Sequence, residues 1–473
     1  MDKRILMFAL SALLCSGSYA KVKLPHLISD NMIIQSDTQA RLWGWDKPGK
    51  TVNVKVSWSS SRYSAKTGSD GKWEVKVKTP KAGYTPLTIT FDDGDKTVIN
   101  NVLAGEVWVC GGQSNMEMPV RGFGQCPLEN YNEVVLDAKE SKGVRYARLP
   151  MIMSMTPLED TKCEWKQVTP ATVGGAGATS YFFARLVSRT LGIPVGVIEA
   201  NKGGTRVEAW LNRDNLKAHT DEALDSASIY KRGEMERQLV WGNGTFNPAL
   251  KYTIKGILYY QGCANVGNHP KEYADRLALL VEQWRKAFGE GQIPFYFVEI
   301  APFNYEGPDG TSAAFLREQQ HKAAQLIPNS GIVCTNDCVY PWEGRQIHPA
   351  QKRKVGERLA FWALTKTYGF DGLIYKGPEY QSMKVEGDKI RIKLKDTFDG
   401  IAPTHDMTGF EIAGSDKIFH KATAESDWNN GIVVSSPEVK NPVAVRYCYR
   451  NFLLGNVYNQ GGLPLLPFRT DNW

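Results

Sequence analysis

Apolar and amphipathic segments alternate across the middle of the chain. Between about residues 105 and 368, short apolar runs are separated by segments of helical periodicity. The clearest helix is 273–288, which has one apolar face and ends at Gly289. Alternating strands and helices predict a parallel sheet covered by helices. The expected strands are residues 107–110, 195–198, 254–260, 295–300 and 332–335.

Both flanks of this α/β region show the period of two that indicates antiparallel strands. Val52, Val54 and Val56 alternate with polar residues, and the same alternation returns at Ile390 and Ile392. The chain is therefore expected to fold as a β-domain, an α/β domain and a second β-rich region. The predicted boundaries are 1–20 for a leader, 21–104, 105–369 and 370–473.

The first twenty residues have the pattern of a secretory signal peptide. Lys3 and Arg4 precede an apolar stretch that is too short to span a bilayer, and a cleavage site is expected after Ala20. We therefore expect export to the periplasm or the cell exterior, with no membrane span. Seven of the eight cysteines follow the leader, without CxxC spacing, and are expected to be mostly buried free thiols.

The sequence argues against nucleic-acid binding and nucleotide binding. The net charge of +7 is small for 473 residues and there is no long basic run, so nucleic acid is not an expected partner. Residues 44–51 match the phosphate-loop pattern, but Thr51 leads into a predicted strand instead of a helix, so no nucleotide cofactor is expected.

Four segments carry residues suited to acyl transfer, and three of them directly follow predicted strands. Ser114 follows one strand, the Gly203-Gly204 pair a second and Asn265 a third, while His348 precedes a predicted helix. The carboxyl ends of parallel strands meet at one edge of a sheet. A serine nucleophile needs a base such as histidine, and the developing oxyanion needs N–H donors.

These segments, in this order, resemble the signature blocks of the SGNH hydrolases, and specifically of the sialate O-acetylesterase-like family. The strongest matches are residues 111–116, Gly-Gly-Gln-Ser-Asn-Met, and residues 347–349, Ile-His-Pro. The resemblance covers nearly the whole mature chain and implies a three-layer, flavodoxin-like parallel-sheet hydrolase domain flanked by antiparallel β-domains. It also implies that Ser114 is the nucleophile and His348 the base. The implied oxyanion hole consists of the Ser114 N–H, a glycine of the 203–204 pair and Asn265.

The sequence departs from the family pattern in two places. The block that commonly reads Gln-Gly-Glu-Ser-Asn in the family reads Gln-Gly-Cys-Ala-Asn here, so Cys263 and Ala264 replace its Glu and Ser. In addition, Arg345 and Gln346 stand where many SGNH enzymes carry the aspartate that orients the histidine. Glu343 is the tentative replacement. The alternative, slightly preferred, is a Ser–His dyad in which a backbone carbonyl holds the imidazole Nδ1.

The predicted activity is that of a secreted serine esterase that removes O-acetyl groups from sugars, with sialic acids as the first expectation. The scheme requires no metal or cofactor. Gln113 and Gln261 are expected to contact the substrate, and Arg206 is a candidate partner for the sialic acid carboxylate, although a surface salt bridge would also explain it. The alternatives are a deacetylase of acetylated xylan or another polysaccharide, and a secreted glycan-binding protein without activity.

Overall fold

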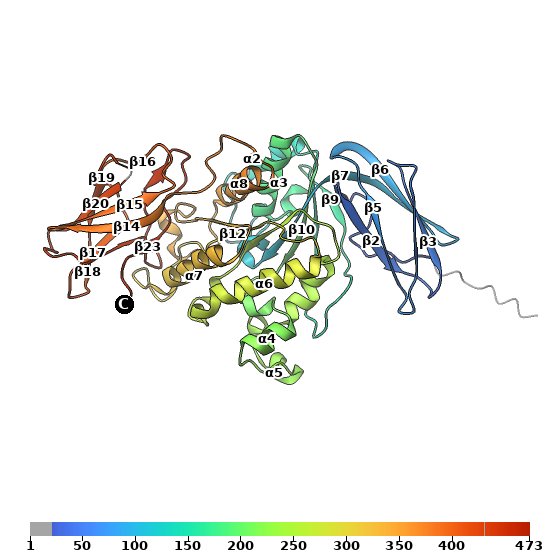
Figure 1. Ribbon diagram of the computed structural model, residues 1–473, viewed down its shortest axis with the longest axis horizontal. Coiled ribbons are helices and arrows are strands. Elements are labelled where there is room, and N and C mark those ends of the chain that lie inside the picture. The colour runs from blue at the N-terminus through green and yellow to red at the C-terminus, as the bar shows by residue number, and fades with distance from the viewer. Residues whose placement is uncertain (1–20, 430) are drawn as a thin grey trace, which may run out of the picture.

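Three regions follow one another along the long axis of the molecule in the computed structural model, which describes residues 21–429 and 431–473 (Figure 1). A mixed α/β region with a large sheet lies between two regions built of strands, so the predicted α/β class is confirmed. The predicted signal peptide lies outside the described residues. Among the helices of the described part, none has the length and apolarity needed to cross a membrane.

The N-terminal region consists mainly of antiparallel β-structure, although its strand β1 pairs parallel with the long strand β7 (Lys96–Gly112). Strand β2 pairs with β5. Strand β3 lies between β4 and β6, and β6 pairs in turn with β7. The segment that resembles a phosphate loop ends at Thr51, the first residue of β3, so no helix follows it. The strands are β1 (Ile33–Gln35), β2 (Gln39–Trp45), β3 (Thr51–Val56), β4 (Arg62–Lys66), β5 (Lys72–Lys78) and β6 (Gly83–Asp92).

Strand β7 (Lys96–Gly112) belongs to two regions at once. Its first part pairs antiparallel with β6, and its second part, from Glu106, lies parallel to β10 (Val195–Asn201) in the central sheet. Gly105 marks the passage between them, where a Cβ atom would lie 2.3 Å from the carbonyl oxygen of Pro194. The boundary expected between residues 104 and 105 therefore falls inside one unbroken strand.

The central sheet has the strand order β13-β12-β11-β7-β10-β8-β9, and only β9 runs antiparallel to its neighbour. Side chains of β7 alternate between the two faces: Val107 and Val109 enter one buried cluster, while Trp108 and Cys110 enter the other. A sheet buried on both faces explains why its strands are continuously apolar. The remaining strands are β8 (Val144–Arg148), β9 (Trp165–Gln167), β11 (Gly256–Tyr260), β12 (Phe295–Val298) and β13 (Ser330–Val333).

Helices cover both faces of this sheet. Helix α3 (Ala178–Leu191) packs against α8 (Lys352–Trp362) on the face of Trp108, and α6 (Tyr273–Phe288) packs against α7 (Ser312–Leu326) on the other. The predicted helix at 273–288 is confirmed as α6, which Gly289 ends in the left-handed conformation. The shorter helices are α1 (Ser114–Glu117), α2 (Tyr131–Asp137), α4 (Arg213–His219) and α5 (Ser226–Lys231).

The C-terminal region contains two four-stranded antiparallel sheets that enclose their own apolar core. It attaches to α7 through polar contacts: Arg317 donates to the carbonyl oxygen of Arg450, and Arg469 pairs with Glu318 at 3.1 Å. Its strands are β14 (Glu379–Glu386), β15 (Lys389–Lys395), β16 (Ile401–Ala402), β17 (Phe410–Ala413), β18 (Phe419–Lys421), β19 (Thr423–Ser426), β20 (Gly431–Ser435), β21 (Ala444–Tyr447), β22 (Tyr458–Asn459) and β23 (Phe468–Arg469).

All seven cysteines of the described chain are free thiols, and five of them are buried. The other two, Cys126 and Cys163, are partly exposed. The expectation of mostly buried free thiols is confirmed.

The contact between α3 and α8 depends on Gly356, so we predict that Gly356→Ala destabilises the protein. The added methyl would lie 2.5 Å from the carbonyl oxygen of Thr179 and 2.7 Å from the Cβ of Phe182. Overpacking of this kind costs about 1–3 kcal/mol, which outweighs the helix-propensity gain of about 1 kcal/mol. Thermal unfolding followed by circular dichroism should show Tm lowered by about 3 °C.

The matched control is Gly83→Ala in β6, where an added Cβ would meet no atom within 4 Å. Its Tm should stay within about 1 °C of the wild-type value, since the substitution adds no contact. An unchanged Tm for Gly356→Ala would contradict the packing of α8 on α3.

Candidate active site

Three adjacent strands of the central sheet end at the same level. Gly112 at the end of β7 pairs with Asn201 of β10 on one side and with Tyr260 of β11 on the other. The loops that leave these strands therefore begin side by side, at the edge where ligands bind in open parallel sheets. They enclose a pocket of about 530 Å³, lined by Gln113, Ser114, Glu117, Phe123, Met151, Lys202, Gly203, Gly204, Met235, Cys263, Ala264, Ile347 and His348.

Ser114 is the first residue of α1 and is positioned by the turn before it. Gly112 has a φ of +139°, and a Cβ there would lie 2.3 Å from the carbonyl oxygen of Tyr260, so only glycine fits. The Gln113 side chain accepts a hydrogen bond from the Gly262 N–H at 2.7 Å and joins the turns after β7 and β11. Gln113, which was expected to contact the substrate, lines the pocket, but its side-chain oxygen already has this structural partner.

His348 lies across the same pocket, in the loop before α8. Asn115 donates to the carbonyl oxygen of Ile347 at 2.9 Å, which ties the turn that carries Ser114 to the histidine loop. The Phe123 ring packs edge-on against the imidazole, with 5.1 Å between ring centroids. Nδ1 lies 3.7 Å from the sulfur of Cys126. Within residues 21–429 and 431–473, no atom hydrogen-bonds the buried Nε2 of His348.

The surroundings of His348 favour its neutral form. Burial and, to a smaller extent, the positive charge of Lys352 together lower the pKa of the imidazole to about 4. Burial also lowers the pKa of Lys352 to about 7. The Lys352 ammonium is fully buried and donates to Asn115 Oδ1 at 2.8 Å and to the carbonyl oxygen of Pro349 at 2.7 Å. At neutral pH the imidazole can therefore accept a proton.

The glycine pair predicted to contribute to the oxyanion hole lies close to Ser114. A Cβ at Gly203 would lie 3.2 Å from the Ser114 Cβ, and the Gly203 N–H donates to the Glu117 carboxylate at 2.7 Å. Gly204 has a φ of +75°, and Met235 occupies the space where its side chain would be. The pocket therefore has backbone N–H groups beside the hydroxyl, one of them held by Glu117.

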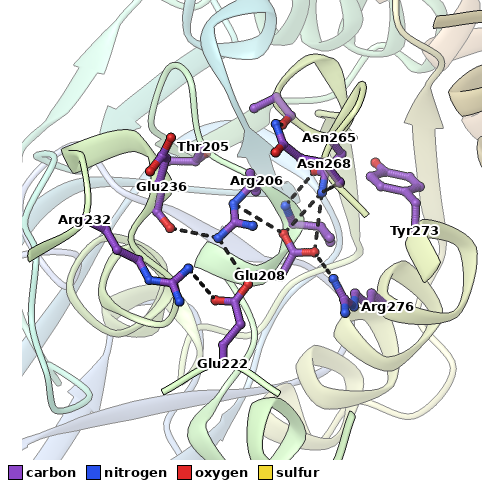
Figure 2. Close-up of polar contacts among 12 residues, drawn as sticks. Thr205, Arg206, Glu208, Glu222, Arg232, Glu236, Asn265, Asn268, Tyr273 and Arg276 are labelled. Atoms are coloured by element: carbon purple, nitrogen blue, oxygen red, sulfur yellow. Dashed lines mark hydrogen bonds and ion pairs between the residues drawn. The ribbon is translucent and has the colours of Figure 1, made fainter. Parts of the chain in front are cut away.

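Asn265 does not reach the pocket. Gly262 has a φ of +147° and begins a 3₁₀ turn over Cys263–Asn265, so residues 263 and 264 line the pocket while Asn265 turns into the interior. Its side chain is fully buried, donates to Glu208 at 3.2 Å and accepts from the Val207 N–H at 2.9 Å (Figure 2). The assignment of Asn265 to the oxyanion hole is therefore not supported by its position.

Arg206 also lies in this buried network instead of the pocket (Figure 2), and Gln261 contacts the same network. Arg206 pairs with Glu222 at 3.2 Å and donates to the carbonyl oxygen of Glu236 at 2.9 Å. Gln261 donates to Asn265 Oδ1 at 2.9 Å and is buried. The structure therefore agrees with the alternative explanation of Arg206, a salt bridge, except that this salt bridge is buried and not on the surface. The network holds together the loops after β10 and β11.

Glu343 does not contact His348. Its carboxylate accepts from the Tyr340 N–H at 2.8 Å and from the Ala350 N–H at 3.0 Å, so it braces the loop from both ends. The alternative, a backbone carbonyl on Nδ1, is not present in the described chain either, since the neighbour of Nδ1 there is the Cys126 sulfur. Neither arrangement expected for the third member of a triad is therefore found in the described chain, and the side chain in contact with Nδ1 is the Cys126 thiol.

The pocket and near-pocket residues that were not singled out as site residues from the sequence include Glu117, Lys202, Cys126 and Lys352. Glu117 and Lys202 stand within segments that carried the candidates, whereas Cys126 and Lys352 gave no signal, because their proximity to His348 arises only in the folded chain. No group of three or more metal-type ligands is found among the residues that the structure describes.

Comparison with known proteins agrees with this geometry. A family model described as carbohydrate esterase, sialic acid-specific acetylesterase, matches residues 104–365, more than half of the chain. The human sialate O-acetylesterase is 27% identical over 406 residues, which cover 78% of this chain and 75% of that protein. The mouse sialate O-acetylesterase is 26% identical over 409 residues, 74% of each chain.

Among solved structures, a carbohydrate acetylesterase from Xanthomonas citri superposes with a TM-score of 0.84 and 31% sequence identity, covering 96% of this chain and 100% of that one. The agreement extends over all three regions of the molecule. The chain therefore belongs to the sialic acid-specific acetylesterase family of carbohydrate esterases, and it is a carboxylic ester hydrolase.

Proposed function

We propose that the protein is an exported serine esterase that removes O-acetyl groups from sugars, foremost from sialic acids, by Ser–His acyl-enzyme chemistry. The observation that carries this proposal is that Ser114, His348 and the backbone of Gly203 line one pocket at the ends of adjacent parallel strands. Because of the same shared pocket, we assign residues 105–369 to the SGNH type of hydrolase domain. Export rests on the sequence of the first twenty residues.

In the proposed first step, His348 Nε2 accepts the proton of the Ser114 hydroxyl while the Ser114 oxygen attacks the acetyl carbonyl carbon. The resulting oxyanion binds backbone N–H groups of Ser114 and of the glycine pair. Because Glu117 holds the Gly203 N–H, the oxyanion either displaces this carboxylate or uses the Gly204 N–H. The bond to the sugar oxygen then breaks, and the sugar leaves with the proton from His348.

In the second step, His348 accepts a proton from water, and the resulting hydroxide attacks the acetyl-enzyme. The bond between acetyl carbon and Ser114 breaks, acetate leaves, and the proton returns from His348 to the serine oxygen. The catalytic groups are one hydroxyl, one imidazole and backbone N–H donors.

Recognition of sialic acid requires a cation for its carboxylate, and Lys202 meets this requirement better than Arg206. Lys202 lines the pocket beside Ser114. Its ammonium lies over the Trp241 ring, 4.7 Å from the centroid, and pairs with Glu234 at 2.8 Å. Glu234 is half exposed, so a substrate carboxylate can replace it at modest cost.

The existing pair of Lys202 with Glu234 is also the observation that favours the second candidate. A neutral substrate, such as acetylated xylan or another acetylated polysaccharide, would leave this ion pair undisturbed. The two candidates share the same chemistry and differ in whether the charge of Lys202 contributes to binding.

We predict that Ser114→Ala lowers kcat for p-nitrophenyl acetate at least about a thousandfold, because the nucleophile of the proposed acyl-enzyme is removed. Initial rates of nitrophenol release are the measurement. The control is Ser382→Ala, an exposed serine of β14 in the C-terminal region, which should retain wild-type rates. Equal rates for Ser114→Ala and wild type would favour a glycan-binding protein over an esterase.

The pH profile is predicted to reflect the low pKa of His348. The base must be neutral, so kcat/KM for the neutral ester should rise through about pH 4 and be level above about pH 5. An unperturbed histidine would place this limb near pH 6.5. Steady-state rates from pH 3 to 8 measure it, with circular dichroism confirming folding at each pH. An acidic limb near pH 6.5 would contradict the lowered pKa of His348.

Lys202→Gln is predicted to raise KM for O-acetylated N-acetylneuraminic acid about tenfold and to leave KM for acetylated xylan within about twofold, since only the former loses a charge-assisted contact. Glu234→Gln should act in the opposite direction by freeing the ammonium. Lys366→Gln is the matched control, because Lys366 also lies over an aromatic ring, outside the pocket. Unchanged KM for the sialic acid, with faster turnover of acetylated xylan, would favour the polysaccharide substrate.

A further inference from the structure

The Nδ1 side of the His348 ring contacts a side chain that the proposed mechanism does not yet use. The sulfur of Cys126 lies 3.7 Å from Nδ1, within hydrogen-bonding range for sulfur. The same thiol donates to Gln346 Oε1 at 3.0 Å, and Oε1 also accepts from the His348 N–H at 3.3 Å. Cys126, Gln346 and His348 therefore form a closed set of contacts behind the imidazole.

The local fold places Cys126 there specifically. The backbones of Phe123 and Cys126 pair with each other through two hydrogen bonds of 3.1 and 2.8 Å, which makes residues 123–126 a tight turn. A Cβ at Gly122, where φ is +74°, would lie 2.4 Å from the carbonyl oxygen of Cys126, so the turn requires glycine. This turn presents the Phe123 ring to the imidazole face and the Cys126 thiol to Nδ1.

The direction of each hydrogen bond follows from the donors and acceptors present. The Gln346 amide nitrogen donates to the carbonyl oxygen of Gln125 at 3.3 Å, so its oxygen faces the Cys126 thiol and accepts the S–H proton. The sulfur lone pairs are then available to Nδ1, which must carry the proton. The lone pair of the imidazole is consequently on Nε2, the nitrogen that a general base needs.

We propose that Cys126 occupies the place of the triad acid as a positioning residue, holding His348 in the tautomer protonated at Nδ1 through a neutral N–H···S contact backed by Gln346. The inference rests on the proposed role of His348 as the base for Ser114. It differs from an Asp-based triad in one physical respect: the thiol orients the imidazole without adding a negative charge.

The other groups facing His348 do not take this role. Glu343 is engaged by two backbone N–H groups, and Lys352 brings a positive charge that disfavours the imidazolium. Phe123 contributes only a ring contact, and Ser114 lines the pocket as the proposed nucleophile. Replacing the thiol by a carboxylate should therefore raise the pKa of His348 if the side chain at position 126 contacts Nδ1. If Cys126 has only a structural role, the pKa of His348 should stay unchanged.

The test compares Cys126→Ala, Cys126→Ser and Cys126→Asp in the full-length protein, with p-nitrophenyl acetate as the substrate. Cys126→Ala should lower kcat about tenfold with KM within about twofold, because one neutral hydrogen bond is lost. Cys126→Ser, which can both donate and accept, should recover most of this loss. Cys126→Asp should move the acidic limb of kcat/KM upward by about one to three pH units, because a carboxylate favours the imidazolium.

A spectroscopic measurement reads the tautomer directly. In ¹⁵N-histidine-labelled protein at pH 7, with the His348 signals assigned by their loss in His348→Asn, wild type should show Nδ1 protonated and Nε2 unprotonated. Cys126→Ala should show a mixture of both tautomers. The matched control is Cys163→Ala, the other partly exposed thiol of the described chain, which should change neither the rates nor the His348 signals.

The inference is overturned if Cys126→Ala retains kcat within twofold and the wild-type tautomer, or if Cys126→Asp leaves the acidic limb in place. Should Cys126→Ala fail to fold, Cys126→Ser and Cys126→Asp decide the question by the same readouts. Failure of the proposed function looks different: in that case Ser114→Ala keeps its activity. Loss of activity in Ser114→Ala together with wild-type behaviour of all Cys126 variants overturns the role of the thiol alone.

Discussion

Strand β7 joins the N-terminal β-domain to the central sheet and leads directly to Ser114. One unbroken segment pairs with the N-terminal strands in its first part and forms the middle of the central sheet in its second. Its last residue, Gly112, is followed by Gln113 and Ser114. Because β7 has neighbours on both sides, the hydroxyl of Ser114 is placed by the hydrogen-bond register of three strands instead of by a flexible loop. The N-terminal β-domain thus pairs with the strand that leads to Ser114, although none of its residues lines the pocket.

Loops that leave a sheet need support of their own, and here it comes from buried polar groups. The fully buried Glu208 carboxylate receives hydrogen bonds from Arg276 at 2.5 Å and from Asn265 at 3.2 Å (Figure 2). A buried charge without a partner would destabilise the fold severely, so the Glu208 carboxylate can be buried only because Arg276 and Asn265 donate to it. The network joins the loops after β10 and β11 to α6, and it holds the glycine loop beside Ser114.

The sequence sufficed for features that follow from local patterns, and failed where a single turn decided the direction of a side chain. Helix 273–288, the β regions on both flanks, and a pocket shared by Ser114 and His348 all follow from periodicity and from the rule that parallel strands end at one edge. Asn265 was misplaced because Gly262 begins a 3₁₀ turn that points the asparagine inward. Cys126 could not be found, since it is 222 residues from His348 in sequence and meets it through loop packing alone.

The electrostatics of the site are the reverse of those in a Ser-His-Asp triad. There a buried carboxylate stabilises the imidazolium; here burial and the nearby Lys352 lower the pKa of His348 to about 4. A base of low pKa removes the serine proton less readily, but its conjugate acid gives up the proton more readily. In the proposed reaction the leaving group is a sugar alkoxide, which must be protonated as the acyl-enzyme forms. A strongly acidic imidazolium, oriented by a neutral thiol, suits this second transfer. The missing aspartate is therefore compatible with catalysis, because the same environment that weakens the first proton transfer assists the departure of the sugar.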